Sequence, residues 1–91
     1  MNNKKILIVA EYIGDRRGEY EFELVDSDEF EEALSKCLEY REGSGTSYLS
    51  TCEEEAVASL LEVSVLNAHC WHKEVPADIR RDEIRALIRG R

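Results

Sequence analysis

Two β-branched and apolar segments separated by a short turn predict a β-hairpin at the start of the chain. From Lys5 to Ile13 apolar residues occupy both alternating faces, a pattern typical of a central strand buried on two sides. Residues 14–18 are bounded by glycines and predict a turn. Residues 19–25 then alternate strictly, with aromatic residues and leucine on one face and three glutamates on the other. We expect a second strand with one face in water.

Three helices are expected after this hairpin. A capping-box spacing opens the first helix, whose apolar stripe runs from Phe30 to Leu38. A second helix starts after Thr51, and its apolar positions continue through Trp71 until Pro76 ends the helical geometry. A last helix covers about residues 77–89, with arginines toward its negative end.

A short third strand is expected at Ser47–Ser50, because an isolated hairpin is only marginally stable. Pairing beside Lys5–Ile13 would make that strand central, as its two-sided pattern requires. The sequence therefore predicts a single α+β domain over residues 1–91. In it, a small antiparallel β-sheet, made of the hairpin and a short third strand, packs with three helices in the order β-β-α-β-α-α.

The predicted second helix is apolar around nearly its whole circumference. One thin sheet can bury only one stripe of such a helix. The helix is therefore expected either to lie at the centre of the domain or to form an interface. The pattern favours a homodimer through the Val57–Trp71 helix.

Charge and composition exclude several classes of function. The chain has 91 residues and a net charge of −8, but residues 1–75 carry −10 and residues 76–91 carry +2. The acidic body should repel nucleic acid and membrane surfaces. No apolar stretch approaches the ~20 residues of a membrane span, and the first one is too short for a signal peptide. Three cysteines, an odd number, are expected to be reduced thiols in a cytoplasmic protein.

Residues 69–72, His-Cys-Trp-His, are the strongest candidates for site chemistry. On a helix His69 and His72 would share a face, but no C-x₂-C pair accompanies them, so no zinc site is expected. Cys70 has histidine neighbours without a recognised nucleophile signature, and adjacent helical residues diverge by about 100°. With no glycine-rich phosphate loop, we predict neither a cofactor nor enzymatic activity.

The remaining feature is an acidic stretch between positions 19 and 32, which contains no basic residue. Alternate strand residues lie about 6.8 Å apart, and phosphates of a nucleic-acid strand rise about 3.4 Å each. A row of strand glutamates therefore matches every second phosphate. The alternative is an ordinary solvated face, whose acids prevent aggregation at an exposed edge. The candidate partner-binding residues are Glu19, Glu21, Glu23, Asp26, Asp28, Glu29, Glu31 and Glu32.

These features favour a non-enzymatic inhibitor that presents an acidic, phosphate-mimicking face to a basic nucleic-acid-binding protein. Phage-encoded anti-CRISPR and anti-restriction proteins share this general character, as an analogy of type rather than a family resemblance. An immunity protein or antitoxin, or an adaptor subunit of an oligomer, is the second hypothesis. A small enzyme using Cys70, His69 or His72 is the third.

Overall fold

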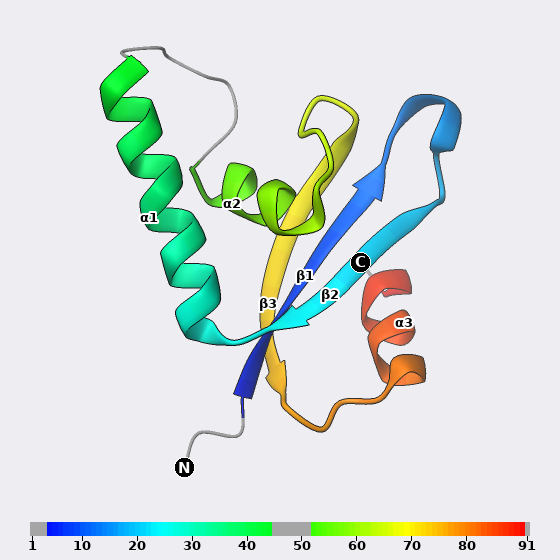
Figure 1. Ribbon diagram of the computed structural model, residues 1–91. Coiled ribbons are helices and arrows are strands. Elements are labelled where there is room, and N and C mark those ends of the chain that lie inside the picture. The colour runs from blue at the N-terminus through cyan, green and yellow to red at the C-terminus, as the bar shows by residue number, and fades with distance from the viewer. Residues whose placement is uncertain (1–3, 45–51, 91) are drawn as a thin grey trace.

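The fold was analysed in a computed structural model that describes residues 4–44 and 52–90, and the side chains of residues 4–39 and 52–90. Three antiparallel strands and three helices form an α+β domain, which confirms the predicted fold class (Figure 1). The elements are β1 (Lys4–Tyr12), a 3₁₀ turn η1 (Gly14–Arg16), β2 (Tyr20–Val25), α1 (Ser27–Ser44), α2 (Cys52–Leu61), β3 (Ala68–Pro76) and α3 (Arg81–Arg89).

The strand order is β2-β1-β3, so β1 is central as its two-sided apolar pattern predicts. Ile8 lies opposite Glu23 on β2 and His72 on β3, and Ala10 lies opposite Glu21. Because successive side chains of a strand point to opposite faces, this register fixes which residues of all three strands share a face.

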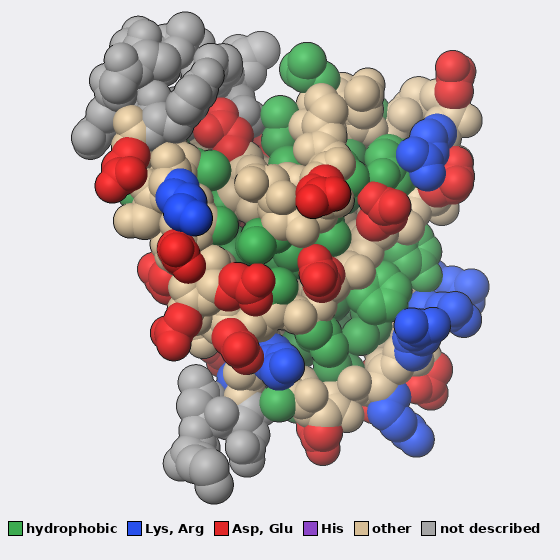
Figure 2. Space-filling model, in the orientation of Figure 1, with side chains coloured by type: hydrophobic (Ala, Val, Ile, Leu, Met, Phe, Trp, Pro, Cys, Tyr) green, Lys and Arg blue, Asp and Glu red, His purple; other side chains and the backbone are tan. Residues whose placement is uncertain are grey.

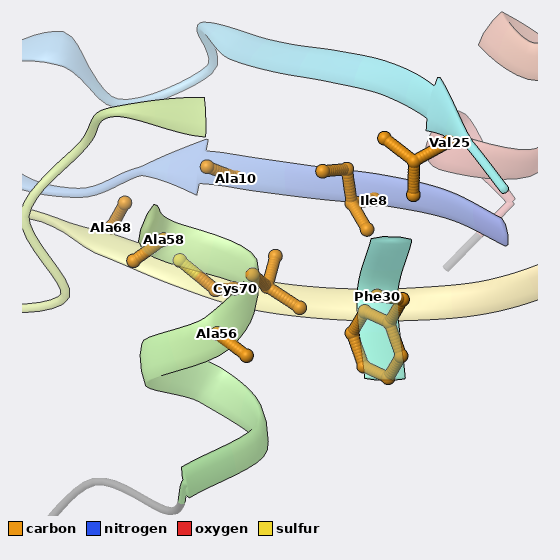
Figure 3. Packing of buried hydrophobic residues seen from close by; sticks show 9 residues of the cluster. Ile8, Ala10, Val25, Phe30, Ala56, Ala58, Ala68 and Cys70 are labelled. Carbon is orange, nitrogen blue, oxygen red and sulfur yellow. The ribbon is translucent and has the colours of Figure 1, made fainter. Parts of the chain in front are cut away.

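The sheet is buried on both faces by two separate cores. Even-numbered residues of β1 face α1 and α2, where Ile8 and Ala10 pack with Phe30, Ala56 and other buried residues (Figure 3). Odd-numbered residues of β1 face α3, whose Ile84 and Ile88 pack on Leu7, Val9 and Val75. Leu7, Ile8, Val9 and Ala10 have no exposed surface, so the central strand contributes to both cores in alternation.

The predicted helix through Trp71 is wrong beyond Leu61. Glu62 has a φ of 57°, in the left-handed region, which ends α2 and turns the chain toward β3. The apolar residues of the predicted helix are divided among α2, the connecting residues 62–67 and β3, whose Cys70 and Trp71 point into opposite cores. The strand that pairs beside β1 is therefore Ala68–Pro76, and it follows both α1 and α2, giving the chain order β-β-α-α-β-α.

The third strand expected at Ser47–Ser50 lies outside the described residues. The last helix begins at Arg81 rather than near Ala77, because residues 77 and 78 form a turn after Pro76. The Val57–Trp71 helix proposed as a dimer interface does not exist as one element. Val57 is fully buried within the domain, so it is not available to a second copy.

Candidate functional site

The three glutamates near the hairpin lie on the same face of the sheet as α1 and α2. Glu21 and Glu23 stand opposite Ala10 and Ile8, whose side chains point into the α1–α2 core. The helices pack mainly over β1 and β3, so the part of this face over β2 is left open and both glutamates are exposed. Glu19, just before β2, is exposed as well.

The acids that follow β2 continue this surface onto α1. Asp26 links the strand to the helix, and the first two turns of α1 carry the remaining four acids. All five are exposed. Figure 2 shows acidic side chains spread over α1 and across the same face toward β2, with hydrophobic side chains between them. We call the eight acids from Glu19 to Glu32 the acidic face.

Three members of the acidic face are paired with cations from the same molecule. Glu19 binds Arg16, with Nε 3.3 Å from Oε2, and Glu32 lies 3.5 Å from Lys36. Asp26 lies 4.0 Å from Lys5. These contacts are solvent-exposed, so each contributes little to stability.

Glu21 accepts a hydrogen bond from the hydroxyl of Tyr12 at 2.6 Å. This bond raises the pKa of the Tyr12 phenol, with smaller contributions from desolvation and from the charge of Glu21. Among the side chains that the structure describes, no cation forms an ion pair with the other four members, which are Glu23, Asp28, Glu29 and Glu31. These four and Glu21 have the largest capacity to bind an external cation.

An open groove of about 410 Å³ borders the acidic face. It is lined by Glu21, Phe22 and Glu23 of β2 and by residues 60–62 at the end of α2. The sequence analysis missed this groove, because Leu60 and Leu61 were assigned to the interior of a longer helix. The end of α2 at Leu61 is what brings their half-buried side chains beside the two glutamates.

The histidines and Cys70 do not form the arrangement that a helix would give. On β3, His69 and His72 are three residues apart and point to opposite faces. His72 Nδ1 lies 2.6 Å from Glu53 Oε1 without a hydrogen bond between them, and its ring packs 4.5 Å from that of Phe30. His69 Nδ1 lies 3.9 Å from Glu54 Oε1. The described residues bring together no group of three metal-ligating side chains.

Burial of Cys70 makes its thiol a poor nucleophile. The residue is 6% exposed in the α1–α2 core. Burial raises its pKa to about 11, with a smaller contribution from the charge of Glu54. The thiolate is the reactive form, so it is scarce at neutral pH. Burial also raises the pKa of Cys37, which packs against the same core.

Comparisons with known proteins add no family to these observations. No protein-family model matches the chain, and no curated protein or solved structure shows significant similarity to it. No helix within the described ranges is long and apolar enough to cross a membrane. The proposal below therefore depends on the geometry and charge of the acidic face.

Proposed function

We propose that the protein is a non-enzymatic inhibitor that binds a basic, nucleic-acid-binding protein through the acidic face. The observation that carries the proposal is the group of five acids without an intramolecular ion pair among the described side chains. In this group, Glu21 and Glu23 lie on β2 and Asp28, Glu29 and Glu31 on α1. Solubility alone does not require such a cluster, because a surface that mixes acidic and basic side chains is also soluble.

Competition for a phosphate-binding groove is the mechanism that this arrangement supports. Glu21 and Glu23 are alternate strand residues, about 6.8 Å apart along β2. That distance matches two phosphate steps of a nucleic-acid strand, about 3.4 Å each along the axis. Lysines and arginines that bind phosphates would meet carboxylates at a compatible spacing. The net charge of −8 would in addition accelerate association with a cationic protein.

The test compares two variants with the same change in net charge. One carries Glu21→Lys with Glu23→Lys, and the control carries Asp78→Lys with Asp82→Lys, in the turn after β3 and on α3. All four side chains are exposed, so both variants should fold like the wild type. A partner is first isolated from a host lysate, and its association rate is then measured at low and high salt.

We expect the β2 variant to associate at least about tenfold more slowly at low salt and to lose most of its salt dependence. The control should differ from wild type by much less, because its charges lie away from the acidic face. Equal effects of the two variants would mean that only total charge matters. Unchanged binding by the folded β2 variant would assign the acidic face to solubility alone.

A further inference from the structure

In the part of the chain that the structure describes, no other strand covers the outer edge of β2. The N–H of Tyr12 donates to the carbonyl of Glu19 at 2.9 Å. Tyr12 and Glu19 are therefore a hydrogen-bonded pair, and the carbonyl of Glu19 points inward, toward β1. By the alternation of an antiparallel ladder, Glu21 and Glu23 also direct their N–H and C=O groups toward β1. Tyr20, Phe22 and Leu24 therefore direct theirs outward. No hydrogen bond to these outward groups occurs within the part of the chain that the structure describes.

The opposite edge of the sheet is different. On β3 the even-numbered residues direct their backbone groups outward, and the carboxylate of Glu54 accepts the N–H of Cys70 at 3.4 Å. A side chain of α2 thus occupies part of that edge, and the ring of His72 lies against Phe30 of α1. Of the two edges, β2 is therefore the one on which the structure shows no outward N–H bonded to a helix side chain among the described residues.

Side chains on the two faces of β2 define what such a strand must carry. Glu21 and Glu23 stand on one face, beside the groove lined by Leu60 and Leu61. Tyr20, Phe22 and Leu24 stand on the other face, half-buried against the α3 core, with the first two rings stacked at 6.2 Å. A strand paired to β2 would place alternate side chains on these two faces.

Charge selects the occupant of this edge. Sheet edges are commonly protected by charged side chains, which repel further copies of the same strand. A second β2 paired here would set glutamates near glutamates, which is unfavourable across a strand pair. Lysine or arginine opposite Glu21 and Glu23 would be favourable, and apolar residues between them would extend the Tyr20–Phe22 surface.

We propose that β2 is a docking edge that accepts an extended segment of the partner, in which lysine or arginine alternates with apolar residues. Main-chain hydrogen bonds to Tyr20, Phe22 and Leu24 would supply affinity, and the two faces would supply specificity. The inference rests on the proposed function, because the same basic partner supplies the segment. It adds a fourth strand to the sheet, whereas the proposed function requires only contact between charged surfaces.

The first experiment uses a blocked synthetic peptide in which lysine and valine alternate, added to the ¹⁵N-labelled full chain. A peptide with the same composition, its lysines and valines in separate blocks, is the matched control. In the free protein, the amides of Phe22 and Leu24 should exchange with solvent about a hundredfold faster than those of Glu21 and Glu23, which bond β1.

The alternating peptide should slow exchange of the Phe22 and Leu24 amides at least about tenfold and leave the inward amides unchanged. The block peptide should have a much weaker effect. Equal binding of the two peptides without added protection at Phe22 and Leu24 would overturn the proposal, as would failure of the alternating peptide to bind.

The second experiment removes one outward donor and keeps every side chain. N-methyl-Phe22 can be introduced by ligating a synthetic segment of residues 1–36 to the segment that begins with Cys37, and the unmethylated ligation product is the control. Methylation faces away from β1, so the circular dichroism spectrum should match that of the control. Affinity for the alternating peptide and for the isolated partner should fall about tenfold or more, since a hydrogen bond is lost and a methyl group blocks the edge.

The two proposals fail in distinguishable ways. If Glu21→Lys with Glu23→Lys abolishes partner binding and N-methyl-Phe22 leaves it unchanged, the acidic face binds the partner and the docking edge is refuted. If N-methyl-Phe22 weakens peptide binding but the charge variant binds the partner normally, the edge accepts strands while the inhibitor proposal is refuted.

Discussion

Glu62 occupies a backbone conformation that suits glycine better, so we expect Glu62→Gly to stabilise the protein. Its φ is 57°, in the left-handed region. The amide of Glu62 donates to the Ser59 carbonyl at 3.2 Å, and that of Val63 donates to the Ala58 carbonyl at 3.0 Å. These two hydrogen bonds form a Schellman motif, in which the left-handed position is usually glycine.

The magnitude follows from two opposing terms. A residue with a Cβ loses about 1–2 kcal/mol in the left-handed conformation. Glycine avoids this cost but loses about 0.5–1 kcal/mol through the greater freedom of the unfolded chain. The expected net gain is about 0.5–1 kcal/mol in the free energy of unfolding, which raises Tm by about 2–8 °C for a domain of this size.

Urea denaturation followed by fluorescence of Trp71, the only tryptophan, measures this gain. Glu62→Ala is the control, because alanine removes the carboxylate but keeps the Cβ, and it should bring no gain. The sign of the difference in unfolding free energy between Glu62→Gly and Glu62→Ala tests whether the chain turns at this position. If helix continued through position 62, glycine there would be about 1 kcal/mol less stable than alanine. That result would refute the end of α2 at Leu61.

Three further predictions concern the thiol, the two cores and metal. In a variant whose other cysteines are replaced by serine, native Cys70 should react with a disulfide reagent at pH 8 at least about tenfold more slowly than in denaturant. Its pKa of about 11 lowers the fraction of thiolate, and the greater nucleophilicity of that thiolate compensates only part of the lost reaction rate. Equal rates in the native and denatured protein would contradict the burial of Cys70. Leu7→Ala and Ile8→Ala, in different cores, should each cost about 2–5 kcal/mol in urea denaturation, whereas Leu66→Ala, at a side chain 83% exposed, should change stability by less than about 0.5 kcal/mol. If only one of Leu7→Ala and Ile8→Ala lowered the unfolding free energy, one of the two cores would be absent. Chelator should leave the urea midpoint unchanged, because the chain has no closely spaced ligand pair; tightly bound zinc whose removal unfolds the protein would contradict this.

The hairpin and the first helix could be predicted from the sequence because each shows one clear period. Apolar residues on both faces of Lys5–Ile13 require cover on two sides, and the structure supplies it with α1 and α2 on one side and α3 on the other. The alternation of acidic and apolar residues over positions 19–25 predicts that one face of β2 is exposed to water. Val25 before α1 and Phe30, where the predicted apolar stripe begins, are both buried in one cluster.

The segment after Leu61 could not be predicted in the same way. Its apolar residues show no single period, so a helix and a strand fit them about equally. The signal that ends α2 is a hydrogen-bonding pattern around Glu62 rather than a glycine, and glutamate is otherwise a good helix former. Pro76 was assigned as the end of a helix, although it ends a strand at the edge of the sheet, where proline is tolerated.

The candidate site was predictable in its exposure but not in its pairing. Exposed acids on a strand face follow from alternation alone. Glu19 is paired because the hairpin turn places Arg16 beside it. The same turn places the Arg16 guanidinium 3.9 Å from the centre of the Tyr12 ring. The register between β1 and β2 decides that Glu21 and Glu23 share a face with α1 and α2. Neither can be derived from one strand considered by itself.

The acidic face and the open edge meet at β2. Among the described residues, α2 packs mainly over β3 and β1 and meets β2 only at its end, and α1 packs mainly on α2. Residues of β2 on that face must then tolerate water, which Glu21 and Glu23 do. The outward backbone groups of Phe22 are accessible for a different reason, which is that β2 is an edge strand. A helix shifted over β2 would bury the glutamates without cations, at a high desolvation cost. Because Phe22 lies between Glu21 and Glu23 on β2, a partner that neutralises these glutamates also lies beside the edge.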